Sequence, residues 1–514
     1  MPAASLTIDP AFRIGPVDPR LYGSFVEHLG RCVYTGLHEP DHETADKDGF
    51  RQDVADLVRE LGVPIIRYPG GNFVSGYNWE DGVGPVGQRP RRLELAWRSI
   101  ETNQVGTDEF VKWAGSVGAD PLLAINLGTR GIDAARNLVE YCNHPGGTYW
   151  SDLRRANGSP QPHGVKVWCL GNEMDGPWQI GHQTAAEYGR LAAETARVMR
   201  LVDPGIELVA CGSSHRRMPT FASWEATVLA EAYDAVDYVS MHAYFEQHGA
   251  DRDSFLACAV EMDQAIEEVV ATADHVRAAG RHRKRLGISF DEWNVWYLSR
   301  FQAAEEQSER DWAVAPRLLE DVYSVTDAVV VGSLLITLLR HADRVKIGCL
   351  AQLVNVIGPI MTAPGGPAWR QASYHPFALT SRYGRGTVLR LEPTSDRHET
   401  AEHGDVPLLD AVAVLADEPG GPGESGESGE LRLFAVNRHQ HEPLTLDVDL
   451  RGLPGLAVAT HLALADDDPD AINTAAEPDR VSPRRLADRT IDAGRLRTVL
   501  PPLSWNLLRL SPPG

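Results

Sequence analysis

The chain has 514 residues, with 71 acidic against 49 basic side chains and a formal net charge of −22. Such a negative protein repels nucleic-acid backbones and anionic membranes, so neither is expected as a partner. Hydrophobic residues make up 43%, enough for a large core, which excludes general disorder. The length favours two to four domains, because single cores rarely grow beyond about 300 residues.

Three features predict a cytoplasmic protein. The first twenty residues lack the basic start and apolar core of a secretory signal. The longest apolar run, Ala328–Leu339, is too short for a bilayer, which takes about 20 residues. The cysteines are far apart and form no CxxC pair, which predicts reduced, buried thiols.

Short apolar segments alternate with amphipathic helical patterns up to about residue 380. The first helical pattern, Phe50–Gly62, spaces its apolar residues on one helical face and ends at a glycine. Further helices are predicted over Thr184–Leu201 and Asp253–Ala279. Eight strand candidates recur: Leu21–Phe25, Val63–Tyr68, Leu122–Asn126, Val165–Leu170, Ile206–Cys211, Val236–Met241, Leu286–Phe290 and Val345–Leu353. Eight apolar strands separated by helices predict an α/β fold, a (β/α)₈ TIM barrel.

Polar side chains repeatedly follow these predicted strands. In a barrel of this kind the carboxyl ends of all strands meet on one face, where active sites are built. We therefore expect one pocket lined by the groups at these ends: Glu27 and His28, Arg67 and Tyr68, Asn126, Asn172 and Glu173, His242 to Tyr244, Asp291 to Asn294, and Gln352.

The pattern changes from about Arg385. Short segments separated by Gly, Pro and Asp predict an all-β sandwich: Leu431–Val436, Leu444–Leu450, Val458–Leu464 and Trp505–Leu510. Ser5–Ile14 has no role in the barrel and is expected to add one strand to this sandwich. The predicted domains are residues 1–18 for that strand, 19–382 for the catalytic barrel and 383–514 for the jelly-roll-like sandwich. The Gly-, Ser- and Glu-rich stretch Glu418–Glu430 predicts a flexible surface insertion.

Two motifs resemble cofactor or metal sites but are better explained otherwise. The glycines at 421, 423 and 426 match a dinucleotide fingerprint, yet they lead into a strand rather than a helix. The His- and Glu-rich tract His38–Glu43 lies in a polar stretch between Pro and Gly positions, which predicts a solvated loop. No cofactor and no metal are therefore expected.

Two glutamates carry the chemical signal. Glu173 follows the fourth predicted strand and Glu292 the seventh, so the two carboxylates can face each other across the pocket. Paired carboxylates cleave glycosidic bonds, one acting as acid and then base while the other attacks carbon or activates water. Attack needs carboxyl groups about 5–5.5 Å apart and the water route about 6.5–9.5 Å, so spacing along the chain leaves a retaining and an inverting glycosidase both open.

Each glutamate taken alone is better explained as a barrel-rim residue in an ion pair. Nearby tryptophans change this balance, because sugar rings stack on aromatic faces. Those tryptophans are Trp168, Trp178, Trp293 and Trp296. Together with the polar strand ends, they favour a glycosidase.

Five long motifs make a family resemblance specific. They are Tyr22–Arg31 (YGSFVEHLGR), Arg67–Gly84 (RYPGGNFVSGYNWEDGVG), Leu170–Gly181 (LGNEMDGPWQIG), Ser289–Tyr297 (SFDEWNVWY) and Leu350–Val356 (LAQLVNV). The chain closely resembles the intracellular α-L-arabinofuranosidases of glycoside hydrolase family 51. The resemblance extends along essentially the whole chain, down to Leu503–Asn506 (LSWN).

The resemblance implies a retaining mechanism, with Glu173 as general acid/base and Glu292 as nucleophile. It implies that Arg67 places a charge beside the nucleophile, that Trp296 is a pocket aromatic and that Trp97 flanks the leaving group. It also implies a set of residues that bind the arabinofuranose hydroxyls or orient the catalytic pair: Glu27, Asn72, Asn172, Tyr244 and Gln352.

The expected activity is the release of terminal non-reducing α-L-arabinofuranosyl residues from arabino- or arabinoxylo-oligosaccharides by double displacement. The resemblance further implies a homo-oligomer, often a hexamer, without a metal. The Glu418–Glu430 insertion departs from the family pattern and puts oligomer contacts in doubt. Two alternatives stay open: a retaining glycosidase acting on β-xylosides or β-glucans, and a carbohydrate-binding protein without catalysis. Linkage preference does not follow from the sequence.

Overall fold

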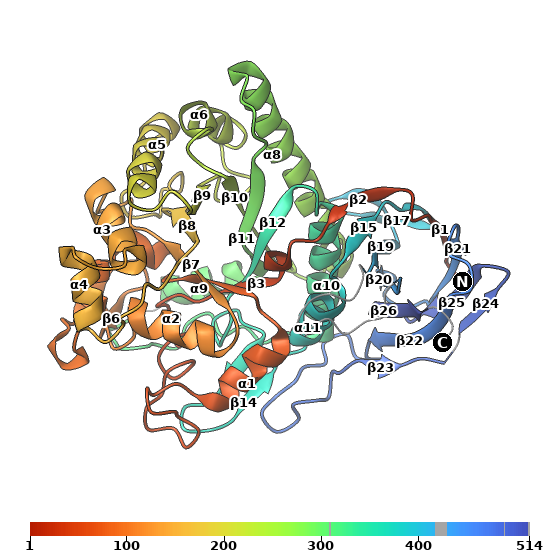
Figure 1. Cartoon of the computed structure of the whole chain (residues 1–514). Coiled ribbons are helices and arrows are strands. Elements are labelled where there is room, and N and C mark those ends of the chain that lie inside the picture. Colours follow the sequence, from red (N-terminus) through yellow and green to blue (C-terminus); the bar gives the residue numbers. More distant parts are fainter. Residues whose placement is uncertain (308–309, 417–428, 488, 512–514) are drawn as a thin grey trace.

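The computed structural model describes residues 1–307, 310–416, 429–487 and 489–511. Its larger part is a closed barrel of parallel strands in the order β3, β4, β7, β8, β9, β10, β11, β12 (Figure 1). Their bounds are Gly23–Phe25, Ile65–Tyr68, Asp120–Ala124, Val167–Leu170, Glu207–Ala210, Tyr238–Phe245, Gly287–Val295 and Val345–Ala351. Each overlaps one predicted strand, which confirms the predicted barrel.

Helices form the outer layer around these strands (Figure 1). They are α1 Gln52–Leu61, α2 Thr107–Ser116, α3 Ile132–Asn143, α4 Tyr149–Ala156, α5 Ala185–Val202, α6 Ser223–Ala232, α7 Arg252–Ala257, α8 Ala259–Gly280, α9 Leu298–Gln307, α10 Val325–Arg340 and α11 Tyr374–Tyr383. Helix α1 ends at Gly62, whose φ of 75° permits the left-handed cap. The predicted helix Asp253–Ala279 is wrong in one respect, because Cys258 separates α7 from α8.

The second part is a sandwich of two antiparallel-rich sheets, ordered β16-β1-β21-β25-β24 and β2-β15-β19-β20-β26-β22-β23. Their bounds are β1 Ala3–Ile8, β2 Arg13–Pro16, β15 Thr387–Leu389, β16 Glu392–Ser395, β19 Leu409–Leu415, β20 Leu431–Asn437, β21 Leu444–Leu450, β22 Ala457–Leu464, β23 Arg484–Arg485, β24 Arg489–Asp492, β25 Arg495–Leu500 and β26 Ser504–Ser511. All four sandwich segments expected from the sequence are strands.

The N-terminal segment joins the sandwich as predicted, but as two strands rather than one. Ser5–Ile14 is not one strand: β1 joins the five-stranded sheet and β2 the seven-stranded sheet. The chain turns between them, where the Phe12 N–H donates to the Asp9 carbonyl. Pro10 interrupts the strand there, because it has no N–H to donate to a sheet. The Glu418–Glu430 insertion and the glycine fingerprint within it lie outside the described residues, apart from Gly429 and Glu430.

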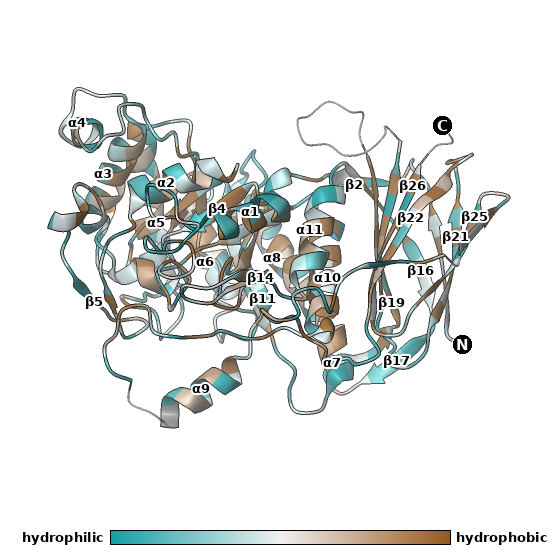
Figure 2. Ribbon diagram, turned by 90° about the horizontal axis from the view of Figure 1, so that it is seen from below, coloured by the Kyte–Doolittle hydropathy of each residue, from teal (hydrophilic) through white to brown (hydrophobic). Residues whose placement is uncertain are grey.

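Helix α10 contains the longest apolar run and joins the two parts of the molecule (Figure 2). Every residue of Val325–Leu339 is buried, because α10 contacts barrel strands β11 and β12 and sandwich strands β19, β20 and β26. A helix that is hydrophobic all round is one that lies in a core. Among the described residues, no helix combines the length and hydropathy that a membrane crossing requires.

This junction allows a test of the packing. A Cβ added at Gly332 of α10 would lie 2.2 Å from Cδ1 of the buried Trp505. We expect Gly332→Ala to cost about 1–3 kcal/mol of stability through overpacking and to lower the midpoint of urea unfolding. Gly115→Ala in α2 is the matched control, since nothing lies within 4 Å of its added Cβ. That change should gain up to about 1 kcal/mol from helix propensity. Equal midpoints for both variants would contradict this description of the junction.

Candidate active site

A cavity of about 620 Å³ opens at the carboxyl ends of the barrel strands. It lies where a (β/α)₈ barrel builds its active site. Most of the predicted site residues line it: Glu27, Asn72, Trp97, Glu173, Tyr244, Glu292, Trp296 and Gln352. The other two, Arg67 and Asn172, are buried, and Arg67 donates hydrogen bonds to both Asn172 and Glu292. The structure therefore brings all ten into one constellation.

Both carboxylate oxygens of Glu292 are held by donors. Arg67 Nη1 donates to Oε1 at 2.5 Å and the Tyr244 hydroxyl donates to Oε2 at 2.7 Å. Arg67 Nη2 also donates to Asn172 Oδ1 at 2.7 Å. Glycine is required at position 71, because a Cβ there would lie 2.9 Å from Glu292 Oε1. These contacts fix the direction in which the carboxylate faces.

A bulge in β11 explains how two successive acidic residues serve one site. Between Ser289 and Glu292 this strand has one residue more than β10 has between Ser240 and His242. Its register with β12 also shifts in this region. Side chains of a regular strand alternate between faces, whereas a bulge changes the direction of a side chain. Asp291 and Glu292 consequently both reach the same group, Arg67.

Glu173 follows β8 in a left-handed backbone conformation, with φ of 43°. Such a conformation is costly for a side chain other than glycine and is typical of functional sites. Trp178 Nε1 donates to Glu173 Oε2 at 2.8 Å, and His242 Nδ1 lies 2.9 Å from Oε1. Burial raises the pKa of Glu173, and the nearby Glu292 charge adds to this, although the His242 and Trp178 hydrogen bonds oppose it.

His242 and Asp291 are site residues to which the sequence analysis assigned no role. The His242 ring lies between Glu173 and Asp291, with Nε2 3.1 Å from Asp291 Oδ1. Burial lowers the pKa of His242, but Glu292, Asp291 and Glu173 outweigh it and raise the pKa to about 10. His242 Nδ1 also lies 3.7 Å from Glu292 Oε2, so the ring, which these carboxylates favour as an imidazolium, lies between Glu173 and Glu292. The positions of His242 and Asp291 at strand ends were the only signal for these two residues in the sequence.

Glu173, His242 and Glu292 form the one group among the described residues with the donor types and spacing of a metal site. Their ligand atoms lie within 4.8 Å of one another. An imidazolium, however, has no lone pair for a metal, and both ring nitrogens of His242 already face carboxylates. The donor set fits a proton network rather than a resident cation.

Glu27 has a different environment from the two central glutamates. It accepts from the Phe73 N–H, from Trp97 Nε1 at 3.0 Å and from Gln352 Nε2 at 3.0 Å. Burial nevertheless raises its pKa to about 8. Gln352 Oε1 is buried without a hydrogen-bond partner and can accept from a ligand hydroxyl.

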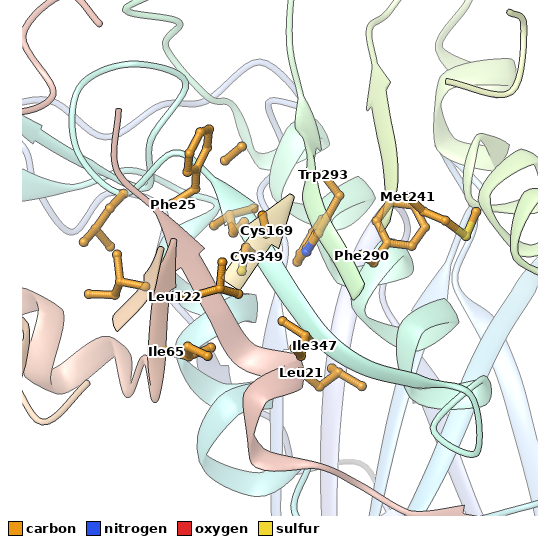
Figure 3. Packing of buried hydrophobic residues seen from close by; sticks show 14 of the residues in the cluster. Leu21, Phe25, Ile65, Leu122, Cys169, Met241, Phe290, Trp293, Ile347 and Cys349 are labelled. Carbon is orange, nitrogen blue, oxygen red and sulfur yellow. The ribbon is translucent and has the colours of Figure 1, made fainter. Parts of the chain in front are cut away.

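The sugar-stacking role assigned to four tryptophans is wrong for two of them. Trp178 and Trp296 line the cavity, whereas Trp168 and Trp293 are fully buried in the core. Figure 3 shows Trp293 among the residues of this core. Trp293 follows Glu292 on β11, so its side chain points to the opposite face, where it stacks on Phe377 of α11.

Other polar groups at the strand ends also lie outside the cavity lining, among them His28, Tyr68, Asn126 and Asn294. His28 is bonded to Glu101 and Tyr68, Asn126 to the loop around Thr129, and Asn294 to backbone carbonyls. Each satisfies buried or loop groups instead of facing the cavity.

The His- and Glu-rich tract His38–Glu43 is not a solvated loop throughout. His38 and His42 are buried, and the His42 ring bonds to Thr44 and to the Gly366 carbonyl. Glu39 pairs with the buried Arg51 at 2.9 Å. The tract is therefore packed at its histidines and at Glu39, while Asp41 and Glu43 are exposed as predicted.

The Trp178 hydrogen bond predicts a pH effect. Trp178→Phe removes a donor to the Glu173 carboxylate, so the pKa of Glu173 should rise and its acid form should persist to higher pH. We expect the alkaline limb of the pH profile of kcat/KM to move upward by about one pH unit, as loss of one hydrogen bond to an ionised carboxylate would give. Trp312→Phe, at an exposed tryptophan, should leave the limb in place. A downward move of the alkaline limb in Trp178→Phe would contradict the assignment of Glu173 as the acid.

Comparisons with known proteins agree with this geometry. Residues 57–265 match the model of the α-L-arabinofuranosidase 1 domain, and residues 291–504 match that of the α-L-arabinofuranosidase C-terminal domain. The chain is 59% identical to an intracellular exo-α-(1→5)-L-arabinofuranosidase of Streptomyces lividans, over 100% of this chain and 76% of that one. It is 51% identical to an exo-α-(1→6)-L-arabinofuranosidase of Bifidobacterium longum, over 98% and 97%.

A solved structure extends the agreement to three dimensions. AbfB, a family 51 α-L-arabinofuranosidase from Bifidobacterium longum, superposes with a TM-score of 0.93 and is 47% identical, covering 99% of this chain and 100% of that one. The family 51 enzyme of Thermotoga petrophila gives a TM-score of 0.84 at 32% identity, covering 99% and 100%. The chain therefore belongs to the α-L-arabinofuranosidases of glycoside hydrolase family 51.

Proposed function

We propose that this protein is a retaining exo-α-L-arabinofuranosidase that releases terminal non-reducing arabinofuranosyl residues from arabino- or arabinoxylo-oligosaccharides. The observation that carries the proposal is the spacing of its two carboxylates. One carboxylate oxygen of Glu173 lies within 4.8 Å of one carboxylate oxygen of Glu292. This separation favours direct attack, at about 5–5.5 Å, over the water route, at about 6.5–9.5 Å.

The unequal surroundings of the two glutamates divide the work between them. Burial and the neighbouring Glu292 raise the pKa of Glu173, so it can hold a proton for the leaving oxygen. Glu292, aimed by Arg67 and Tyr244, attacks the anomeric carbon and forms a covalent glycosyl-enzyme. Glu173 then takes a proton from the water that releases the sugar.

The inner end of the cavity is suited to a single terminal sugar. Amide and carboxyl groups of Glu27, Asn72, Asn172 and Gln352 surround the nucleophile, together with the Tyr244 hydroxyl. Such groups donate to and accept from ring hydroxyls. Because Glu27, Gln352 and Glu292 are all buried, the sugar that they hold lies at a closed end, which is the geometry that an exo-acting enzyme needs.

A panel of aryl glycosides tests the activity. Aryl α-L-arabinofuranoside should release the aryl alcohol and free arabinose, while aryl β-xyloside and β-glucoside should not react, because furanose and pyranose rings place their hydroxyls differently. Hydrolysis of the β-xyloside in preference would overturn the proposal. Arabinoside binding without release of sugar would instead show a binding protein.

Two further properties are proposed from the resemblance. The relatives named intracellular support an intracellular location, where short imported oligosaccharides are the available substrates. We also expect a homo-oligomer, with a hexamer as the family pattern, which sedimentation equilibrium would measure. A monomer at micromolar concentration would contradict this. One relative is named for (1→5) linkages and another for (1→6) linkages, so these names do not decide which linkage this protein cleaves.

A further inference from the structure

The cavity continues well past the two catalytic carboxylates. From Glu173 it follows Trp178, whose ring is stacked on His215 with centroids 6.1 Å apart and planes at 8°. Two residues later, Arg217 pairs with Glu261 of α8 at 3.0 Å and lies 3.9 Å from Glu402. All of these residues line the same cavity as Glu173 and Glu292. We call this extension, from Trp178 to Glu402, the outer lobe.

One wall of the outer lobe comes from a hairpin that lies between sandwich strands β16 and β19 in the chain, rather than from the barrel. Strands β17 (Arg397–Thr400) and β18 (Gly404–Pro407) form a hairpin, and Glu402 and His403 in its turn line the cavity. The hairpin is docked on α7, where the Glu402 N–H donates to Ser254 Oγ at 3.1 Å. This hairpin of the C-terminal part thus contributes polar groups to the cavity.

The position of Glu173 decides which part of a substrate the outer lobe can hold. A general acid must contact the oxygen of the leaving group, so the leaving group lies on the Glu173 side. The outer lobe begins at Trp178, which is hydrogen-bonded to Glu173 and is 47% exposed. The terminal sugar has its own buried end beside Glu292.

We propose that the outer lobe binds the leaving-group sugars beyond the first, with the hairpin at Glu402 and His403 as part of this binding site. The proposal rests on the proposed function, since it presumes that Glu173 is the acid. It assigns a substrate length: an oligosaccharide with at least two sugars on the leaving side uses contacts that an aryl or monosaccharide leaving group does not reach. A cavity of about 620 Å³ exceeds what one pentose occupies and lies in the range of larger ligands.

The charges of the outer lobe favour neutral sugars over uronic acids. Arg216 is paired with Glu268 at 2.6 Å and Arg217 with Glu261, so both guanidiniums already face carboxylates. Glu402 adds a further negative charge at the same rim. A uronate would meet net repulsion there, whereas sugar hydroxyls can donate to these carboxylates.

The test compares kcat/KM for a linear α-(1→5)-linked arabinotetraose with kcat/KM for an aryl α-L-arabinofuranoside. In Glu402→Ala the ratio of the two should fall at least about ten-fold, as loss of one hydrogen bond to a charged group predicts. Arg217 keeps Glu261 in this variant, so the rim is not left with an unpaired cation. His403→Ala should lower the ratio in the same direction.

Glu399→Ala is the matched control, because Glu399 is an exposed acid of the same hairpin that does not line the cavity. It should leave the ratio unchanged. The inference would be overturned if both Glu402→Ala and His403→Ala left the ratio unchanged. It would also be overturned if a tetraose bearing a uronic acid were cleaved faster than the neutral tetraose. If neither the wild-type protein nor any of these variants cleaved the aryl arabinofuranoside, the proposed function itself would be refuted.

Discussion

Glu292→Ala should lower kcat on an aryl α-L-arabinofuranoside on the order of 10⁵-fold, because loss of a covalent nucleophile removes both chemical steps. Glu173→Ala should behave differently. An activated aryl leaving group needs little acid assistance, so part of the first step survives in this variant and release of the sugar becomes slow. Steady-state and pre-steady-state release of the aryl alcohol would measure both effects.

Azide separates the two roles further. In Glu173→Ala, azide can take the place of water, accelerate turnover and give an arabinosyl azide of retained α configuration. In Glu292→Ala, azide can react only in place of the missing carboxylate, so any azide product has the inverted β configuration. Identical behaviour of the two variants would contradict the assignment of acid/base and nucleophile.

Arg67→Met is expected to have the second largest effect. The buried guanidinium donates to Glu292 and Asn172 and lies 3.8 Å from Asp291 Oδ2. Its removal leaves two buried carboxylates short of a counter-charge, which should cost about 3–5 kcal/mol of stability. Because Glu292 also loses its alignment, kcat should fall on the order of 10²- to 10³-fold in protein that remains folded.

Arg51→Met is the matched control for this variant. Arg51 is equally buried and pairs with Glu39 and Asp53, away from the cavity. Its loss should lower thermal stability by a similar amount while kcat per folded molecule is kept. A loss of kcat in Arg51→Met as large as in Arg67→Met would mean that instability, not the alignment of Glu292, explains the Arg67 effect.

The barrel was predictable because its strands are short, apolar and each followed by a polar group. The predicted strand Val345–Leu353, for example, contains β12 and reaches Gln352 at the cavity. The break at Cys258 was not predictable from periodicity, because it depends on contacts of α7 and α8 with the distant α10. The division of Ser5–Ile14 into two strands has a local signal in Pro10, whereas the assignment of the two strands to different sheets depends on distant segments.

Within the site, the sequence located residues better than it located their side-chain directions. Trp293 adjoins Glu292 in the chain but is buried on the other side of β11. Asp291 reaches the site only because the strand is bulged there. The link through His242 depends on β8, β10 and β11 meeting in the barrel, a relation between segments far apart in the chain.

Hydrolysis of an aryl α-L-arabinofuranoside in aqueous methanol tests double displacement most directly, with the methyl glycoside identified by proton NMR. A covalent intermediate on Glu292, opened from the face that Glu173 serves, predicts methyl α-L-arabinofuranoside, the retained anomer. Methyl β-L-arabinofuranoside would show a single displacement and would contradict the roles of Glu173 as acid/base and Glu292 as nucleophile.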